Sequence, residues 1–213
     1  LSRSLDKNQK ILKEIFDHCD DLVFHELLIG QNKKNIRVLV VFFDSLTSQE
    51  LLERSLLRAL TSVDSDSSEE KITVNWLRKK KIPSGKIRDK NKWVEVAEDI
   101  SIGSVGLFVE GQDRALLIDL FEDNSRPVSE PLSEVVIKGP SEAFNEELRT
   151  NMALLRKRLP TSRLAAESLK VGVLTKTSIN LVYLKGYVRP ELVEEVRTRV
   201  QKIEVDGITG SNK

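Results

Sequence analysis

The beginning of the chain changes from a helical pattern of apolar positions to two strand-like runs. Within residues 5–16 the apolar side chains recur at the spacing of one helix face, which predicts an amphipathic helix. Residues 22–29 and 36–43 are instead rich in β-branched and aromatic side chains, and a polar turn at 30–35 separates them. We therefore expect two strands, and the second is the better candidate for the centre of a sheet.

Helical patterns then dominate until about residue 100. Residues 48–60 predict a helix with its leucines on one side, and the serine- and acid-rich segment 62–70 predicts a loop. Residues 71–82 and 90–100 predict two more helices, which flank a loop at 83–85. Helices that follow two strands indicate a mixed α/β organisation.

A hairpin and a proline-containing linker follow. Residues 104–110 and 114–121 predict two strands joined by a turn that contains Gly111. Residues 122–134 contain two prolines and no apolar periodicity, and they form the best domain boundary. Beyond this boundary the pattern predicts a strand at 135–137, a long helix, two strands, a second helix and a last strand at 203–205.

These elements predict an α/β protein of two small mixed subdomains packed together. The N-terminal subdomain comprises residues 1–126 and contains the first helices, the strands and the hairpin. The C-terminal subdomain comprises residues 127–207, and residues 208–213 form a tail. A chain of 213 residues with 39% hydrophobic residues is long enough to bury a core in either one large or two small domains.

The long helix of the second half has clear boundaries and two unusual polar features. Gly139 and Pro140 end the preceding strand, acidic residues lie near the predicted helix start, and Pro160 ends the helix. Asn151 falls within the apolar stripe, and Arg149 and Arg156 lie together on its flank. The stripe that we expect to pack inward consists of Phe144, Leu148, Met152, Leu155 and Leu159.

These polar residues are the candidates for an interface. A buried asparagine needs partners, so we expect Asn151 to bond to backbone where the helix meets a strand or linker. Arg149 could pair with Glu146 one turn earlier or with a carboxylate of the first half such as Asp119. Bonding that holds the two halves in one orientation is the simpler interpretation, and a ligand or subunit contact is the alternative. The candidate interface residues are Glu142, Glu146, Arg149, Asn151 and Arg156.

The same helix carries a recognisable motif. Residues 138–159 read KGPSEAFNEELRTNMALLRKRL, which resembles the GP-x-E-x-F-x-E-x-LR-x-N-x-x-LLR-x-R signature of the A subunit of bacterial spore germinant receptors, the GerA family. Residues 168–207, which end in an Asp-Gly pair, are similar to the same family, as is the phrase DLVFHELLIG near the start. The resemblance covers nearly the whole chain and is strongest in its last third.

The resemblance implies a soluble N-terminal domain of a membrane receptor subunit on the cytoplasmic, spore-core side of the inner membrane. It also implies a fold similar to bilobed solute-binding scaffolds. The implied partners are B- and C-type receptor subunits and other A subunits. Because the family normally continues towards a membrane-embedded segment, whereas the tail 208–213 departs from it, we expect the chain to be a piece of a longer protein.

Composition excludes several classes of protein. The longest nearly apolar run, residues 38–43, is far too short to cross a bilayer, and the amino terminus has no apolar region typical of a secretory signal. Cys19 is the only cysteine, which excludes an intramolecular disulfide and suits a reducing compartment. The net charge of +1 gives no overall attraction to nucleic acid or anionic lipid.

No catalytic or metal-binding pattern stands out. His18, Cys19 and His25 are close in sequence, but their spacing does not bring them to one point, so we expect structural or solvated roles. The acidic segment 64–70 alternates like a calcium loop but lacks the glycine and the terminal glutamate of one. We expect no enzyme activity, no catalytic residue, no metal site and no cofactor.

Residues 78–92 form the one strong local cluster of positive charge. The run holds eight Lys or Arg against a single acid, Asp89. A solvated surface is the simpler interpretation, and contact with an anionic membrane is the alternative. We expect no nucleic-acid binding, because Trp76 and Trp93 match a hydrophobic face better than a stacking platform. The possible membrane-surface patch comprises Arg78, Lys79, Lys80, Lys81, Lys86 and Arg88.

Three functional hypotheses remain open. The first is a domain that relays or supports a nutrient signal through subunit contacts and a change in the angle between its halves. The second is direct binding of a small nutrient in the cleft between the subdomains, near Arg149 and Arg156. The third is a membrane-surface module that uses the basic run.

Overall fold

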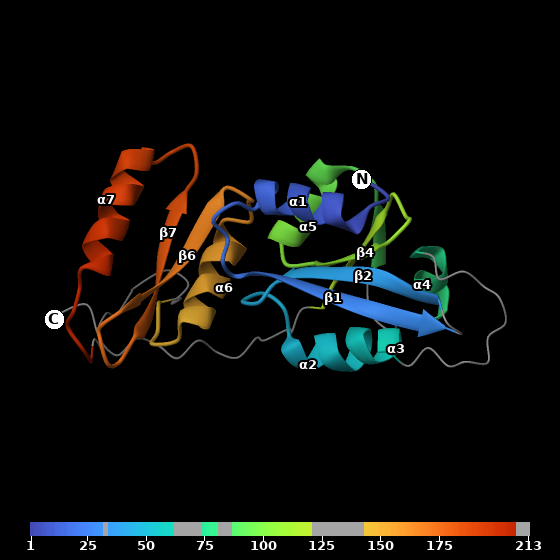
Figure 1. The fold of residues 1–213 in the computed structure, drawn as a ribbon, viewed down its shortest axis with the longest axis horizontal. Coiled ribbons are helices and arrows are strands. Elements are labelled where there is room, and N and C mark those ends of the chain that lie inside the picture. Colours follow the sequence, from blue (N-terminus) through green and yellow to red (C-terminus); the bar gives the residue numbers. More distant parts are fainter. Residues whose placement is uncertain (32–33, 62–73, 81–86, 121–142, 208–213) are drawn as a thin grey trace, which may run out of the picture.

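A computed structural model of the chain describes residues 1–31, 34–61, 74–80, 87–120 and 143–207 (Figure 1). We call residues 1–120 the large lobe and residues 143–207 the small lobe. The described helices and strands are, in chain order, α1 Leu5–Ile15, β1 Leu22–Gln31, β2 Lys34–Phe43, α2 Gln49–Leu51, the π-helical turn η1 Leu52–Leu57, α3 Arg58–Thr61, α4 Val74–Lys80, β3 Ile87–Lys90, α5 Trp93–Ser101, β4 Val105–Val109, β5 Ala115–Ile118, α6 Leu148–Arg158, β6 Leu164–Val171, β7 Thr177–Leu184 and α7 Pro190–Gln201.

The large lobe is built on a five-stranded antiparallel sheet in the order β1-β2-β4-β5-β3. β2 lies between β1 and β4, as its apolar run predicted, and residues 38–43 are all buried. Successive side chains of a strand point to opposite faces. The even-numbered residues of this segment pack with leucines from α2, η1 and α3, whereas the odd-numbered ones pack with α1 and α5. Both faces of the sheet are therefore covered by helices.

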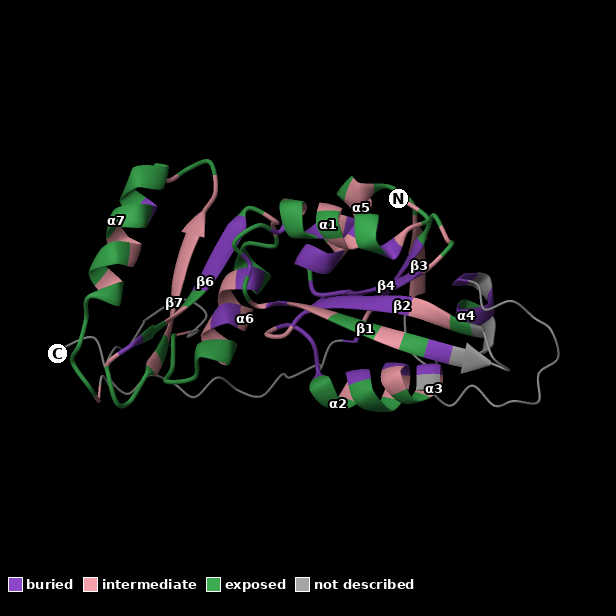
Figure 2. Ribbon diagram, in the orientation of Figure 1, coloured by how far each residue is buried: buried purple, intermediate pink, exposed green. Residues whose placement is uncertain are grey.

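The small lobe contains an antiparallel hairpin of β6 and β7, with α7 packed on β6. The start of β6 is buried, whereas β7 is only partly buried along most of its length (Figure 2). α6 lies between this hairpin and the large lobe (Figure 1). The mixed α/β class is confirmed, and both sheets are antiparallel.

Several predicted elements are confirmed, and the sequence missed one strand. The helix at 5–16, the strands at 22–29 and 36–43, and the hairpin at 104–121 all form. β3 was not predicted, because Ile87 is followed by three charged residues, which give neither an apolar run nor an alternating pattern. It pairs with β5 at the edge of the sheet, so α5 begins only at Trp93.

Two predictions for the second half are wrong. α6 begins at Leu148, with Glu147 as its N-cap, and not near Ser141. Residues 203–205 form no strand, because this segment crosses the end of the β6–β7 hairpin instead of running along it. The boundary at 122–134, the strand at 135–137 and the loops at 62–70 and 83–85 lie outside the described residues. None of the described helices combines the length and the apolar character that crossing a bilayer requires.

Candidate functional site

The inward face of α6 is polar at its centre. Met152 is buried, and one turn later the buried residue is Arg156, whose side chain is 1% exposed. The predicted apolar stripe is wrong in three of its five members, because Phe144, Leu148 and Leu159 are exposed. Phe144 precedes the helix, so it does not share the helical spacing on which the stripe depended.

Arg156 joins the two lobes. Its Nε and Nη2 donate to Oδ2 and Oδ1 of Asp21 at 2.5 and 2.6 Å, and Nη1 donates to the Leu164 carbonyl oxygen at 3.3 Å. The guanidinium carbon lies 3.7 Å from the centre of the Phe43 ring, which gives a cation–π contact. A buried charge is tolerated when it is paired and hydrogen-bonded, and here the fork of donors, the carboxylate and the ring supply those partners.

Arg149 makes a second contact with the large lobe, one that is half-exposed. Its Nε lies 3.2 Å from Oδ2 of Asp44, and its Nη2 donates to the carbonyl oxygens of Asp44 and Thr47 at 2.8 and 3.0 Å. The sequence left two alternatives for Arg149, Glu146 or a carboxylate of the first half such as Asp119, and the structure shows the second kind of partner, in the form of Asp44. Asp119 instead pairs with Arg88 at 2.8 Å.

Asn151 fixes the approach to α6. Its Oδ1 accepts from the Asn145 amide at 2.8 Å, and its Nδ2 donates to the Asn145 carbonyl oxygen at 2.7 Å. The expectation of backbone partners is therefore confirmed, although the side chain is only partly buried. The bonds turn the preceding segment back towards the second turn of the helix, so they stabilise its entry. Glu146 is exposed, and Glu142 lies outside the described residues.

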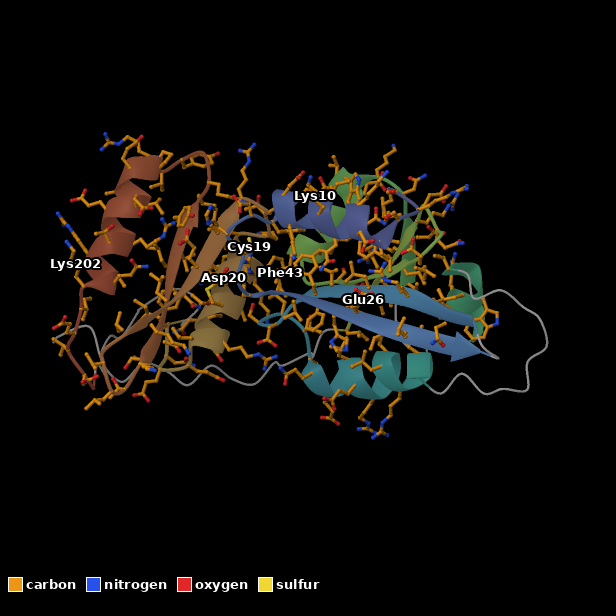
Figure 3. The ribbon with its side chains drawn as sticks, viewed as in Figure 1. Lys10, Cys19, Asp20, Glu26, Phe43 and Lys202 are labelled. Carbon is orange, nitrogen blue, oxygen red and sulfur yellow. The ribbon has the colours of Figure 1, made fainter. Side chains whose placement is uncertain are left out.

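The backbone of the large lobe pairs directly with β6. The Ala166 amide donates to the His18 carbonyl oxygen at 2.7 Å, and the Asp20 amide donates to the Ala166 carbonyl oxygen at 2.9 Å. Cys19 lies between them, and Figure 3 shows it beside Asp20 and Phe43 where the lobes meet. Burial raises the pKa of the Cys19 thiol, even though Arg156 is close. Cys19 is therefore a packing residue at this junction, as the sequence indicated.

A buried carboxylate strengthens the same junction. Glu167 accepts hydrogen bonds from Tyr183 at 2.5 Å and from Arg197 at 2.8 and 2.9 Å, and His18 of the large lobe lies 3.2 Å away. Burial alone raises the pKa of Glu167, but the bonds from Tyr183 and Arg197 outweigh it and hold the pKa below its ordinary value. Lys185 adds a bond to the Asp17 carbonyl oxygen at 2.8 Å, just beyond the end of α1.

Sequence reasoning missed the acidic partners of this junction. Asp21 precedes β1 and Asp44 follows β2, so each lies at a strand end beside buried residues. An acidic residue in such a position indicates a buried ion pair, but its sequence position does not show which basic residue is the partner. The interlobe contact consists of Asp21, Phe43, Asp44, Arg149, Arg156, Glu167 and the paired backbone at 18–20 and 166.

In the described part of the basic run, Arg88 is paired with acidic side chains. Arg88 donates to Asp119 and Ser104 and lies 3.2 Å from Asp99, so its charge is paired within the large lobe, and its place in a membrane-surface patch stays a prediction. The hydrogen bonds that Arg88 donates to Asp119, together with the negative charge of that carboxylate, keep the pKa of Arg88 above its ordinary value. Arg78 is exposed on α4. The side chains of Lys79, Lys80, Lys81 and Lys86 lie outside the described residues.

The described residues offer no metal site, and the interlobe contact is occupied by bonded side chains. Among them, no group of three or more His, Cys, Asp and Glu side chains could hold a metal ion. Two surface hollows of the described part lie along the exposed faces of α1 and α7, away from Arg149 and Arg156. Hydrogen-bonded side chains and paired backbone therefore join the two lobes at the interlobe contact and favour one orientation.

Comparison with known proteins shows which family the sequence matches. Residues 10–213 match the family model described as Bacillus/Clostridium GerA spore germination protein. Spore germination protein KA of Bacillus subtilis (strain 168) is 27% identical over 211 residues, which are 99% of this chain and 38% of that protein. The uncharacterized membrane protein YfkQ of the same organism is 27% identical over 213 residues, which are 99% of this chain and 40% of that protein.

A solved structure has a similar fold. It is the crystal structure of the N-terminal domain of the A subunit of the Bacillus megaterium spore germinant receptor GerK3, with a TM-score of 0.73 and 23% sequence identity. The match covers 97% of this chain and 74% of that chain. Against the two curated relatives named above, this chain spans about two fifths of their length.

Proposed function

Because this chain belongs to the Bacillus/Clostridium GerA family of spore germination proteins, we propose that it is the N-terminal domain of a germinant receptor A subunit. In this proposal the domain relays or supports the nutrient signal that triggers spore germination, through contacts with B- and C-type subunits and with other A subunits. It lies on the cytoplasmic, spore-core side of the inner membrane. The named relatives and the similarity to the solved A-subunit domain support this assignment.

The observation that carries the relay is the interlobe contact. Arg156 meets Asp21 through two parallel hydrogen bonds inside the protein, and Arg149 holds the end of β2 at Asp44 and Thr47. Two-point arginine–carboxylate pairs fix orientation as well as distance. A rotation imposed on one lobe by a neighbouring subunit is therefore transmitted to the other lobe or must break these bonds.

The geometry favours this role over direct nutrient binding at the junction. The Arg156 guanidinium already uses its donors on Asp21 and Leu164, and its outer face covers Phe43. A ligand there would have to displace a buried ion pair. Titration with amino acids, sugars and nucleosides should accordingly leave the melting temperature of the domain unchanged, whereas a nutrient-binding domain would be stabilised as ligand rises above its Kd.

The relay is tested in spores that carry variants of the whole A subunit. Arg149→Ala removes the half-exposed contact and should leave the fold intact, while Arg156→Lys keeps the charge but loses the two-point geometry. Both should slow nutrient-triggered germination at normal receptor levels, measured by immunoblot. Lys157→Ala, which changes an exposed neighbour on the same helix, is the matched control and should behave as wild type. Wild-type germination rates in Arg149→Ala and Arg156→Lys would contradict the proposal.

A further inference from the structure

The turn between β6 and β7, residues 172–176, presents apolar side chains to solvent. We call this segment the hairpin tip. Val173 is 62% exposed and Leu174 is 84% exposed, the largest exposed fraction among the exposed large hydrophobic residues of the described part. Lys170 and Lys176 flank the pair and are exposed as well. Turns are normally polar, so two adjacent aliphatic side chains with this much exposed surface call for a partner.

The hairpin tip is held rigidly by the segment that leaves the domain. Oδ1 of Asp206 accepts from the amides of Leu174 and Thr175 at 2.9 and 3.0 Å and from the Thr175 hydroxyl at 3.2 Å. The Gly172 amide donates to the Ile203 carbonyl oxygen at 3.2 Å, which fastens the other side of the turn. These bonds close the turn, so the side chains of residues 173 and 174 are held outward and cannot fold back onto the lobe.

The position of the hairpin tip suggests what it meets. The Gly207 amide donates to the Thr175 hydroxyl oxygen at 3.3 Å, so the described chain ends beside the tip. This end of the molecule is opposite to α4, where the basic run begins (Figure 1). The chain spans about two fifths of its relatives, one of which is named a membrane protein. Whatever follows residue 207 in the whole protein starts next to Val173 and Leu174.

We propose that the hairpin tip is a membrane-contact point. Val173 and Leu174 enter the interfacial layer of an anionic lipid surface, and Lys170 and Lys176 lie among the headgroups. The aliphatic pair gains from leaving water, and the lysines gain from the negative surface potential while their stems cover apolar surface. This inference rests on the proposed function, since it takes the exit of the domain to lead to a bilayer.

The contact is tested with the chain attached to vesicles through a hexahistidine tag after Lys213. The vesicles contain phosphatidylcholine, phosphatidylglycerol and a nickel-chelating lipid. An environment-sensitive fluorophore is placed at Leu174→Cys, at Leu192→Cys in the same lobe, or at Val94→Cys in the large lobe, all exposed sites. The native Cys19 is buried, and wild-type protein treated with the same fluorophore measures any labelling at that cysteine.

Only the probe at position 174 should shift to shorter wavelength, and brominated lipid should quench it at least about twice as strongly as the other two probes. Replacing phosphatidylglycerol by phosphatidylcholine should weaken this quenching. Equal quenching at all three positions, or none at position 174, would overturn the membrane contact. Such a result would leave the proposed relay untouched, because that proposal is judged by germination of the Arg149 and Arg156 variants. If the hairpin tip contacts protein instead of lipid, the probe at position 174 should not be quenched.

Discussion

Asp21 and Arg156 lie 135 positions apart in the chain, yet their side chains are joined by two hydrogen bonds of 2.5 and 2.6 Å. Asp21 is the last residue before β1, and Arg156 lies in the last turn of α6. The pair is covered on one side by the Phe43 ring. It connects the sheet of the large lobe to the helix that carries the strongest sequence motif, so its removal tests both stability and communication between the lobes.

Arg156→Ala should be the most damaging single change at the interlobe contact. It leaves the Asp21 carboxylate, whose side chain is 14% exposed, without its charged partner. Breaking one side of a buried pair typically costs about 3 to 5 kcal/mol. Urea unfolding of the isolated chain should show this loss. Adding Asp21→Asn should recover part of it, and strict additivity of the two changes would contradict the pairing.

Asn151→Ala should destabilise the chain by about 1 to 3 kcal/mol, because it removes both side-chain bonds to the Asn145 backbone. The amides of residues 145–148 should also exchange faster with deuterium, since the helix entry loses its fixed turn. Thr150→Ala is a useful control from the neighbouring position, because its hydroxyl donates to the side chain of Glu147. Equal exchange rates in the two variants would rule out this role for the asparagine.

Gly172→Ala should lower the melting temperature of the chain more than Gly111→Ala. Both glycines have a positive φ, +84° and +82°, so an alanine is strained at either site by about 1 to 2 kcal/mol. At Gly172 the new Cβ would also lie 2.7 Å from Oδ1 of Asp206, whereas at Gly111 nothing lies within 4 Å. Thermal unfolding should separate the variants, and identical melting temperatures would show that the Asp206 contact is not formed.

The Glu167 network should make stability depend on acid pH. The folded-state pKa of Glu167 lies below its ordinary value of 4.5, so its stabilisation is complete above that pH and is lost as the pH falls through the folded pKa. Glu167→Gln should therefore lower the free energy of unfolding at pH 7 by about 1 to 3 kcal/mol. Below pH 4 the difference from wild type should shrink, as urea titrations at several pH values will reveal. A constant difference at every pH would contradict the assignment.

The surface pair of Arg199 and Glu195 provides a contrast to these buried contacts. The two side chains lie four residues apart on α7 and approach to 2.6 Å, but both are more than half exposed. Arg199→Ala should cost no more than about 0.5 kcal/mol, and 0.5 M salt should remove most of that effect. A loss as large as that of Arg156→Ala would mean that burial is not what gives the interlobe pair its importance.

Local patterns predicted elements whose apolar residues are continuous. Residues 38–43 were recognised as a central strand because every position is apolar, which is how a strand covered on both faces reads. The short edge strand β3 was missed, since residues such as Arg88 and Asp89 interrupt its pattern. The helical stripe of α6 was misjudged because Arg156 was counted as a flank residue, although its long side chain is almost fully buried.

The amino-acid sequence by itself determined the mixed α/β class, most of the strands and helices, and the family motif on the residues around α6. These depend on spacing and composition over a few neighbouring positions, which a sequence displays directly. Only the tertiary structure decided that Arg156 meets Asp21, that Arg149 meets Asp44, and that Val173 and Leu174 stay exposed. A charge pair depends on which distant segments come together, and many carboxylates along the chain are chemically equivalent partners until folding brings one of them close.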